Sequence, residues 1–386
     1  MTTNGSAIIS IFATHRAQLD ALKANDRLRS LRPRDGRDFS SNDYLGLADS
    51  NELRAALAEG IALRLPMGSG GSRLLRGNHE AHEALEADAA RHYRSEAALF
   101  LSTGFAANAG LFATLPQRGD LLVHDALIHA SAHDGMRIGR ADRVAAAHND
   151  ASAFEDAISA WRAAGGTGRV WIAVESLYSM DGDRAPLADL ALIAKAHDAV
   201  LVVDEAHATG VFGAGGRGLA DSLELGEQLV TLHTCGKALG CEGALICASR
   251  TVIDFLINRG RPFIFSTAPS PLVAHCVRRA IDIAASDPDR RVRLAKLVDH
   301  AASRLAPLGI PATGSQIVPV VIGEDDRTMA MASRLQRHGF DIRGIRPPTV
   351  PEGTARLRLS LTLNVTEADV DAMADALAEA MVPVPA

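Results

Sequence analysis

The sequence predicts an α/β fold, with a mostly parallel sheet in a large domain and a smaller α+β domain towards the C-terminus. Two patterns support this class. Short apolar runs alternate with helical stretches through the middle of the chain, and several runs are almost continuously apolar, as in strands that are covered on both faces. The length of 386 residues, of which 47% are hydrophobic, is enough for two or three domains.

The large domain is expected to consist of alternating strands and helices. The apolar runs that predict strands are residues 97–101, 121–123, 170–174, 199–203, 229–232 and 243–248. Helical patterns between them cover residues 104–115, 151–163 and 186–198. Asp150 is in position to cap the second of these helices. This alternation predicts a parallel sheet with right-handed crossovers.

The pattern changes near residues 286–290, where Ser-Asp-Pro-Asp-Arg interrupts it. Beyond this point the sequence predicts helices at 291–305, 327–338 and 366–381 and strands at 317–322 and 355–361. The last strand alternates strictly between leucines and Arg356, Arg358 and Ser360, which indicates an antiparallel strand with one exposed or ligand-facing side. We therefore predict an N-terminal helical segment (1–44, with a helix near 16–29), a large domain (45–286) and a small domain (287–386).

Charge and cysteine content limit the functional classes. The chain has 40 basic and 46 acidic residues and only 4% aromatic residues, so neither nucleic acid nor an anionic membrane is expected as a general partner. The four cysteines (Cys235, Cys241, Cys247 and Cys276) form no C-x-x-C pair, which disfavours a disulfide framework or a zinc site. No apolar run is long enough to span a membrane, and the first 12 residues lack a basic, apolar export signal. A cytoplasmic protein is expected.

The most informative residues are Asp204, His207 and Lys237. Asp204 closes an apolar run, His207 follows three residues later, and Lys237 lies in the small-residue turn Thr234-Cys-Gly-Lys. Pyridoxal phosphate (PLP) enzymes use a lysine to hold the cofactor aldehyde as a Schiff base and a carboxylate to keep the pyridine nitrogen protonated. An Asp at a strand end and a Lys in a loop also occur in most α/β proteins, so other segments have to support this interpretation.

Three further segments suit such a site, although each also has an ordinary structural explanation. The turn from Ser102 to Asn108 leads from a strand into a helix, whose N-terminal N–H groups would bind phosphate. His129 opens a helix and could either cap it or stack on an aromatic cofactor. The polar residues 175–183 follow a strand, at the edge where α/β sheets place ligands, or form a plain turn.

The chain lacks the fingerprints of other nucleotide-dependent classes. It contains no G-x-x-x-x-G-K-[ST] loop and no dinucleotide fingerprint between a strand and a helix, which disfavours an ATPase or a Rossmann dehydrogenase. The glycine-rich residues 67–73 are either a flexible loop or a loop beside a cofactor or a second subunit. Arginines gather at 343–346 and at Arg356 and Arg358, where they could bind a planar carboxylate or line a solvated strand face.

Taken together, these segments resemble the α-oxoamine synthases, a PLP-dependent family of fold type I. The segments that carry the resemblance are Ser41-Asn-Asp-Tyr-Leu-Gly-Leu47, Gly70-Gly-Ser-Arg73, Gly104-Phe105, His129-Ala-Ser131, Ser179-Met-Asp-Gly-Asp183, Asp204-Glu-Ala-His207, Thr234-Cys-Gly-Lys237 and Arg346-Pro-Pro-Thr-Val-Pro351. They run in order from about residue 29 to 370. Ala208 departs from the family, which commonly has Gly there.

The resemblance implies a set of catalytic residues. Lys237 would hold the cofactor and later move protons, Asp204 would pair with the ring nitrogen, and His129 would stack on the ring. His207, together with Ser179, would hydrogen-bond the phenol oxygen of the ring.

The resemblance also implies residues for phosphate and substrates. Gly104, Phe105 and Thr234 would bind the phosphate. Arg358 would bind the carboxylate of an amino acid. Arg29, Arg346 and Thr349 would bind the acyl substrate or the product.

The run Arg346-Pro-Pro-Thr-Val-Pro351 is most similar to the biotin-pathway member of the family. This implies a homodimeric acyltransferase that condenses L-alanine with pimeloyl-CoA or a pimeloyl-acyl carrier protein and releases CO₂ and the free thiol carrier. Three alternatives remain at this point: a family member with a different amino acid or acyl-CoA, a PLP aminotransferase or lyase, and a catalytically silent binding protein.

Overall fold

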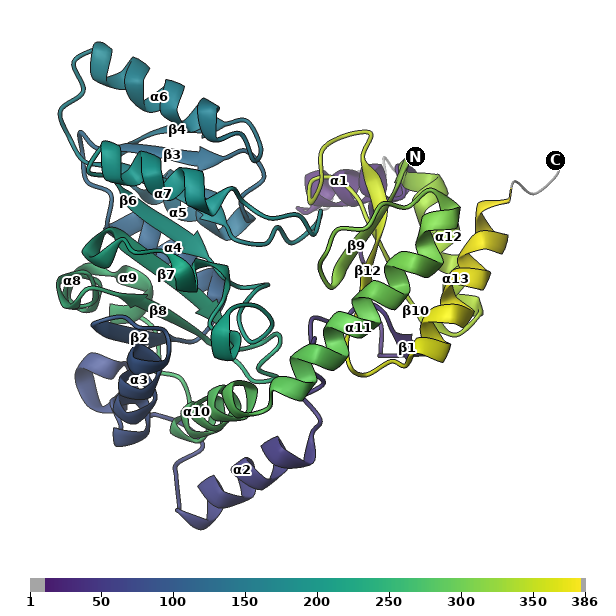
Figure 1. Ribbon diagram of the computed structural model, residues 1–386, viewed down its shortest axis with the longest axis horizontal. Helices are drawn as coiled ribbons and strands as arrows, with labels where there is room; N and C mark the ends of the chain where they lie inside the picture. The colour runs from purple at the N-terminus through teal and green to yellow at the C-terminus, as the bar shows by residue number, and fades with distance from the viewer. Residues whose placement is uncertain (1–10, 383–386) are drawn as a thin grey trace, which may run out of the picture.

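The computed structural model describes residues 11–382. The first ten residues of the predicted segment 1–44 lie outside this range, and with them most of the stretch that is expected to lack an export signal. A seven-stranded sheet with its helices forms one part of the molecule, and a three-stranded sheet with three long helices forms the other (Figure 1). Within the described residues, no helix is both long and apolar enough to cross a membrane.

The large sheet has the strand order β2-β8-β7-β6-β5-β3-β4. All neighbouring strands are parallel except β8, which runs antiparallel to both β2 and β7, so the predicted mostly parallel sheet is confirmed. The bounds are β2 Ala97–Leu101, β3 Leu121–Asp125, β4 Asp142–Ala146, β5 Val170–Glu175, β6 Val200–Asp204, β7 Leu229–Thr234 and β8 Ala244–Ala248.

Strand β4 was not predicted from the sequence. It begins with Asp142 and Arg143 and is exposed over its first four residues, because it is the edge strand of the sheet and pairs only with β3. An edge strand needs no continuous apolar run, since much of it faces water. The apolar pattern therefore identified the inner strands and the other edge strand, β2, which is buried along its whole length, and missed β4.

Both faces of the large sheet are covered by helices, which explains the almost continuously apolar strands. Val202 packs in one hydrophobic cluster with Leu111 of α4, whereas its neighbour Val203 packs in another with Phe154 of α6 and Leu190 of α7. The helices of this part are α2 Asn51–Ala62, α3 Glu80–His92, α4 Gly104–Thr114, α5 Ala130–Ile138, α6 Ala151–Ala163, α7 Leu187–Ala196, α8 Arg250–Arg259, α9 Arg261–Ile264 and α10 Pro271–Ser286.

The smaller part is built on the antiparallel strand order β11-β12-β9. Its strands are β9 Ile317–Gly323, β11 Arg343–Ile345 and β12 Ala355–Ser360, and its helices are α11 Pro288–Leu305, α12 Asp325–Arg337 and α13 Glu367–Met381. The N-terminal chain joins this part, because β1 (Arg37–Asp38) pairs in parallel with β10 (Phe340–Asp341) and Phe39 enters the same core. The domain boundaries at 44 and 286 remain predictions.

Strand β12 decides one of two alternatives. Its alternation predicted one exposed or ligand-facing side, and the exposed alternative is wrong because every residue of β12 is buried. Leu357 and Leu359 belong to the core of the small part, and Arg356 and Arg358 face the loop that follows β5 in the large part. A polar strand face can be buried in this way because each guanidinium finds acceptors in that loop.

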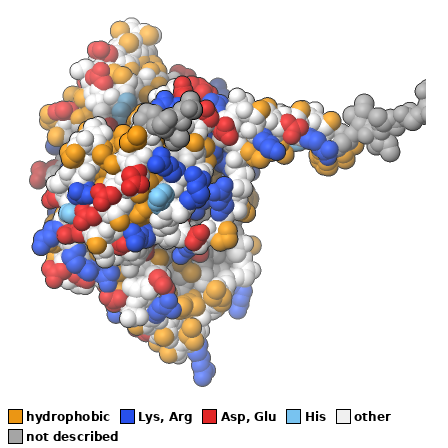
Figure 2. Space-filling view, turned by 90° about the vertical axis from the view of Figure 1, so that its right-hand side faces the viewer, with side chains coloured by type: hydrophobic (Ala, Val, Ile, Leu, Met, Phe, Trp, Pro, Cys, Tyr) orange, Lys and Arg blue, Asp and Glu red, His pale blue; other side chains and the backbone are white. Residues whose placement is uncertain are grey.

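Helix α1 (Ala13–Ala24) is shorter than the helix predicted near 16–29. It ends where the Asn25 side chain bonds to the carbonyl of Ala21 and Asp26 takes a positive φ of 54°. None of the α1 residues is buried, although Leu19 and Leu22 are apolar, and the helix stands away from the body of the molecule (Figure 2).

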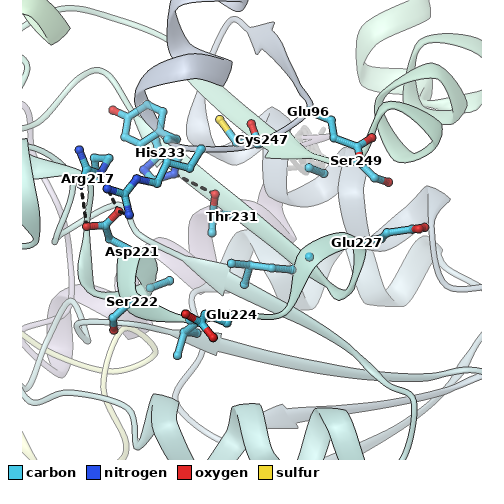
Figure 3. Close-up of a pocket in the computed structure, with 18 residues that line it drawn as sticks. Glu96, Arg217, Asp221, Ser222, Glu224, Glu227, Thr231, His233, Cys247 and Ser249 are labelled. Atoms are coloured by element: carbon cyan, nitrogen blue, oxygen red, sulfur yellow. Dashed lines mark hydrogen bonds and ion pairs between the residues drawn. The ribbon is translucent and has the colours of Figure 1, made fainter.

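A hollow of about 390 Å³ opens at the edge of the large sheet where the parallel strands begin (Figure 3). Its polar groups bond to one another. His233 contacts Thr209 Oγ1 and Thr231 Oγ1, each at 2.9 Å, and stacks on Tyr93 with ring centroids 3.6 Å apart. Arg217 Nε donates to Asp221 at 2.6 Å. We assign these contacts to packing, because they leave these groups satisfied.

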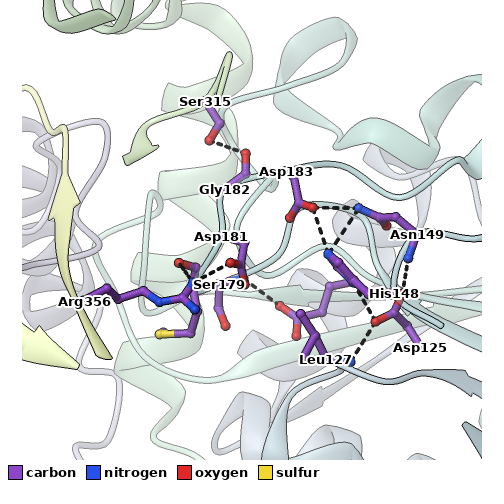
Figure 4. A network of polar contacts seen from close by, with 12 residues as sticks. Asp125, Leu127, His148, Asn149, Ser179, Asp181, Gly182, Asp183, Ser315 and Arg356 are labelled. Carbon is purple, nitrogen blue, oxygen red and sulfur yellow. Dashed lines mark hydrogen bonds and ion pairs between the residues drawn. The ribbon is translucent and has the colours of Figure 1, made fainter. Parts of the chain in front are cut away.

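The loop that follows β5 is held to the large sheet by His148 (Figure 4). The Nδ1 atom of His148 lies 2.9 Å from Asp125 Oδ1 at the end of β3, and its Nε2 atom lies 2.8 Å from Asp183 Oδ2 in the loop. Partial burial opposes the charged form, but the two carboxylates more than offset it and raise the pKa of His148 to about 10. His148 is therefore an imidazolium at neutral pH and links the loop to the sheet.

The small part holds the same loop from the other side. Arg356 donates to the carboxylate of Asp181, and Ser315 Oγ donates to the carbonyl of Gly182 at 2.7 Å (Figure 4). Gly182 has a φ of 71°, and a Cβ there would lie 2.1 Å from the carbonyl oxygen of Ile317. Residues 179–183 thus fit between the two parts only with glycine at position 182.

We predict that His148→Gln destabilises the protein in a pH-dependent way. The folded-state pKa of His148, about 10, lies above the ordinary value of 6.5, so its contribution is complete below pH 6.5 and disappears as the pH rises through about 10. The melting temperature of the variant is expected to fall by about 2–4 °C at pH 6.5. The deficit is expected to shrink towards pH 10, as followed by thermal unfolding.

His197→Gln is a matched control, because His197 has one carboxylate partner, Glu155 Oε1 at 2.8 Å, rather than two. A deficit for His148→Gln that stays constant or grows with pH would contradict the assignment.

Candidate active site

A cavity of about 410 Å³ opens at the carboxyl ends of β5, β6 and β7, beside the N-terminus of α4. Seven of the predicted site residues line it, from segments far apart in the sequence: Gly104, Phe105, His129, Asp204, His207, Thr234 and Lys237. Parallel strands end at the same edge of a sheet, which is why residues that each follow a different strand meet here.

One end of the cavity suits an anion. Helix α4 begins at Gly104, and Thr103 caps it by accepting a hydrogen bond from Ala106 N at 3.0 Å. The first N–H groups of a helix have no partner within it and carry a partial positive charge. A Cβ at Gly104 would lie 2.7 Å from Cγ2 of Thr234, so glycine allows this helix end to approach Thr234.

The buried carboxylate of Asp204 is held by two donors. Asn108 Nδ2 donates to its Oδ2 at 2.7 Å, and the backbone N–H of Ala206 donates to its Oδ1 at 2.9 Å. Asn108 Nδ2 also lies 3.1 Å from Ser131 Oγ, which in turn lies 2.7 Å from His129 Nδ1. This chain of hydrogen bonds fixes the His129 ring relative to Asp204.

Lys237 is half-buried, and its Nζ lies 2.8 Å from Nε2 of His207. Burial lowers the pKa of Lys237 to about 8, although the negative charge of Asp204, and that of Glu175 when it is ionised, oppose this shift. Burial and the nearby charge of Lys237 lower the pKa of His207 well below its ordinary range. The lysine is therefore partly the neutral amine near neutral pH, and His207 is a neutral imidazole.

His207 connects the lysine to the N-terminal segment and the small part. The Tyr44 hydroxyl donates to Asn42 Oδ1 at 2.9 Å, so its oxygen accepts from His207 Nδ1, 2.7 Å away. This assigns the proton of the neutral imidazole to Nδ1 and leaves Nε2 to accept from Lys237. Arg358 Nη2 completes the chain, 3.3 Å from the Tyr44 hydroxyl and 3.1 Å from Asn42 Oδ1.

The other predicted residues lie outside the cavity wall. The backbone carbonyl of Ser179 accepts a hydrogen bond from Arg358 Nε at 2.6 Å. Arg29 Nη2 lies 3.2 Å from Thr349 Oγ1, and Arg346 Nη1 donates to the carbonyl of Asp26 at 2.6 Å. Arg29, Thr349 and Arg346 thus form a second group near the N-terminal segment, and their predicted contacts with substrate remain predictions.

Several polar residues of the cavity were not predicted as site residues. Asn42, Asn108, Ser131 and Glu175 line it, and Tyr44 supports it from behind. All of them except Glu175 occur in or beside segments that carried the family resemblance, and Glu175 ends a buried strand. For Glu175 at a strand end and Ser131 at a helix start, this position was the available signal.

These residues fit PLP. The start of α4 suits a phosphate, Asp204 suits a protonated ring nitrogen, and Lys237 suits an aldehyde. Two buried oxygens of residues that line the cavity, Asn108 Oδ1 and Glu175 Oε1, have no hydrogen-bond partner among residues 11–382. Such unpartnered atoms indicate a polar ligand. No cluster of potential metal ligands occurs in the same range.

Comparison with known proteins agrees with this fit. The model of the aminotransferase class I and II family matches residues 34–377. The 8-amino-7-oxononanoate synthase of Geobacter sulfurreducens is 43% identical over 343 residues, which is 88% of this chain and 87% of that protein. The synthase of Anaeromyxobacter dehalogenans is 40% identical over 385 residues and 96% of each chain.

Solved structures agree as well. Serine palmitoyltransferase of Sphingomonas wittichii superimposes with a TM-score of 0.87 at 26% identity and covers 97% of this chain and 98% of its own. A PLP-bound structure of the same kind of enzyme gives a TM-score of 0.86 at 26% identity, with the same coverage. The predicted fold type I and the PLP cofactor are thereby confirmed. The chain belongs to the aminotransferase class I and II family and, within it, to the α-oxoamine synthases, with 8-amino-7-oxononanoate synthases among its relatives.

Proposed function

We propose that the protein condenses L-alanine with pimeloyl-CoA or a pimeloyl-acyl carrier protein to form 8-amino-7-oxononanoate, CO₂ and the free thiol carrier. This is a step of biotin biosynthesis, and we place it in the cytoplasm. The observation that carries the proposal is the meeting of Lys237 and Asp204 in one cavity, in a chain 40–43% identical to synthases of that name.

PLP, when bound, supplies an aldehyde and a ring that accepts electrons. Lys237 is prepared to attach the aldehyde, because burial lowers its pKa to about 8 and His207 Nε2 orients its nitrogen. The same amine would take a proton from the substrate carbon and return it. Asp204, held as a carboxylate by Asn108 and Ala206, would keep a proton on the ring nitrogen.

Other residues would orient the ligands. His129, fixed by Ser131, would stack on the ring, and His207 and Ser179 would bond to its phenol oxygen. Gly104, Phe105 and Thr234 would hold the phosphate at the start of α4.

Two arginine groups would then serve the two substrates. Arg358, whose Nη2 lies 3.3 Å from the Tyr44 hydroxyl, would bind the carboxylate of alanine. Arg29, Arg346 and Thr349 would receive the acyl substrate; the neighbouring charge of Arg29 adds to the effect of burial in lowering the pKa of Arg346, and an anionic group would relieve this repulsion.

We also propose a homodimer. The glycine-rich loop and the segment after α9 lie together, with Ala268 N donating to the carbonyl of Gly71 at 2.9 Å. Met67, Leu75 and Phe265 on these segments are 76%, 85% and 70% exposed, which is unusual for large apolar side chains. A second copy of the chain would cover this patch, and a two-fold dimer is the commonest closed assembly.

A substrate matrix tests the proposed reaction. The purified protein is supplied with alanine, glycine or serine and with acyl-CoA or acyl-carrier-protein thioesters of different lengths, and CO₂ and free thiol are measured. The largest kcat/KM is expected for alanine with a pimeloyl thioester, and both products are expected in equal amounts. Transamination without thiol release would show an aminotransferase instead.

Arg358→Lys tests the binding of the alanine carboxylate. The ammonium keeps the charge but loses the planar pair of donors, so the KM for alanine is expected to rise by about tenfold or more while the affinity for PLP stays near the wild-type value. Arg356→Lys is a matched control, since Arg356 lies on the same face of β12 but pairs with Asp181. Equal effects of the two substitutions on alanine would remove Arg358 from this role.

We also propose that residues 67–73, Ser266 and Thr267 of one subunit contribute to the active site of the other. Mixed subunits test this shared site. Lys237→Ala abolishes activity in its own subunit, whereas Thr267→Asp places a negative charge on an exposed position of the proposed interface. Each variant alone is expected to be inactive or nearly so. Mixing them is expected to restore up to about a quarter of the wild-type activity, because a two-fold dimer of random composition contains one intact site in half of its molecules. A fully active monomer would refute the dimer.

A further inference from the structure

Glu175 is a buried carboxyl group in the cavity that the proposed reaction has not used. It is the last residue of β5 and pairs in register with Asp204, the last residue of β6. Only 2% of it is exposed, and it lines the same cavity as Lys237. Two buried carboxyl groups on adjacent strands therefore line one cavity, which strongly disfavours two uncompensated negative charges.

The hydrogen bonds decide which of the two keeps a proton. Asp204 accepts from two good donors, at 2.7 and 2.9 Å. Glu175 accepts one longer bond, from the backbone N–H of Ser179 to Oε2 at 3.2 Å, and its Oε1 atom has no partner among residues 11–382. The carboxyl group with fewer donors is the poorer place for a negative charge. The proton therefore belongs to Glu175.

The charges around Glu175 lead to the same result. Burial raises the pKa of Glu175 to about 8, the negative charges of Asp204 and Asp125 act in the same direction, and Lys237 opposes them.

Glu205 shows what a purely structural buried carboxylate looks like in this fold. It follows Asp204 directly and is fully buried, but it accepts from Ser176 Oγ at 2.6 Å and from the backbone N–H groups of Leu219 and Ala220 at 3.1 and 2.5 Å. It does not belong to the cavity wall. Its donors tie the strand end to the following loop, whereas Glu175 lines the cavity and its Oε1 has no partner among residues 11–382.

We propose that Glu175 is a further cofactor-site residue, which stays a neutral carboxylic acid at neutral pH and presents Oε1–H as a hydrogen-bond donor to a polar atom of bound PLP. This inference rests on the proposed function only in taking PLP as the ligand. A neutral donor beside the ionised Asp204 adds a directional contact without adding a second negative charge near the ring.

Infrared spectroscopy of the ligand-free protein tests the protonation state. The wild-type protein is expected to show the carbonyl stretch of a protonated carboxyl group that is lost on titration through about pH 8. Glu175→Gln is expected to remove this band. Glu205→Gln is expected to retain it and to remove only a second band that titrates near pH 7, because burial raises the pKa of Glu205 to about 7. A Glu175→Gln spectrum at pH 7 that still contains every protonated-carboxyl band of the wild type would overturn the proposal.

PLP binding tests the donor role. Titration by fluorescence quenching is expected to give an affinity within about threefold of the wild type for Glu175→Gln, because the amide is neutral and keeps an N–H donor. Glu175→Leu, which has no donor, is expected to bind PLP about tenfold more weakly or worse. Wild-type affinity in Glu175→Leu would overturn the donor role.

Thermal unfolding of the ligand-free variants separates this loss from a folding defect, since Glu175→Gln keeps the size and the neutral state of the side chain. Glu205→Gln is expected to lower the melting temperature while leaving the PLP affinity unchanged. If the wild-type protein itself failed to bind PLP, the proposed function would fail, whereas the infrared result would still decide the protonation of Glu175.

Discussion

The structure depends on the parallel pairing of β5, β6 and β7. This pairing brings the ends of three strands to one edge of the sheet, where Glu175, Asp204 and the turn that carries Lys237 surround one cavity. The strands themselves are buried on both faces, so the polar residues that follow them are the first points at which the chain reaches a ligand. The chemistry of the site is thus a consequence of the sheet.

Burying these charged groups costs free energy, and two chains of hydrogen bonds offset this cost. One runs from Asp204 through Asn108 and Ser131 to His129, within the large part. The other runs from Lys237 through His207 and Tyr44 to Arg358, and so passes from the large part through the N-terminal segment to the small part. Each group in these chains restricts the orientation of the next, which prepares the cavity before any ligand arrives.

The second chain gives the small part a direct influence on the site. Arg358 contacts both Tyr44 and the loop of residues 179–183, and the same loop is fastened to the sheet by the imidazolium of His148. A shift of β12 would therefore move Arg358, which is proposed to bind the alanine carboxylate, and would also disturb the Tyr44–His207 contact that supports Lys237. This connection explains why a strand with a polar face is buried rather than exposed.

The amino-acid sequence by itself determined the fold class, the inner strands of the sheet, the cofactor and seven residues of the cavity wall. These features are encoded locally, by apolar runs and by motifs of adjacent residues such as Asp204–His207. Strand β4 was not predicted, because its first four residues are exposed and form no apolar run. Asn108, Tyr44 and Glu175 were not predicted as site residues, because each acts through a partner that is distant in the sequence. Asn108 bonds to Asp204, 96 residues away, and Tyr44 bonds to His207, 163 residues away. Glu175 lies beside Asp204 on the neighbouring strand. Only the tertiary structure decided which buried polar groups have donors and which do not, since hydrogen bonding and charge burial depend on distances between segments that the sequence keeps apart.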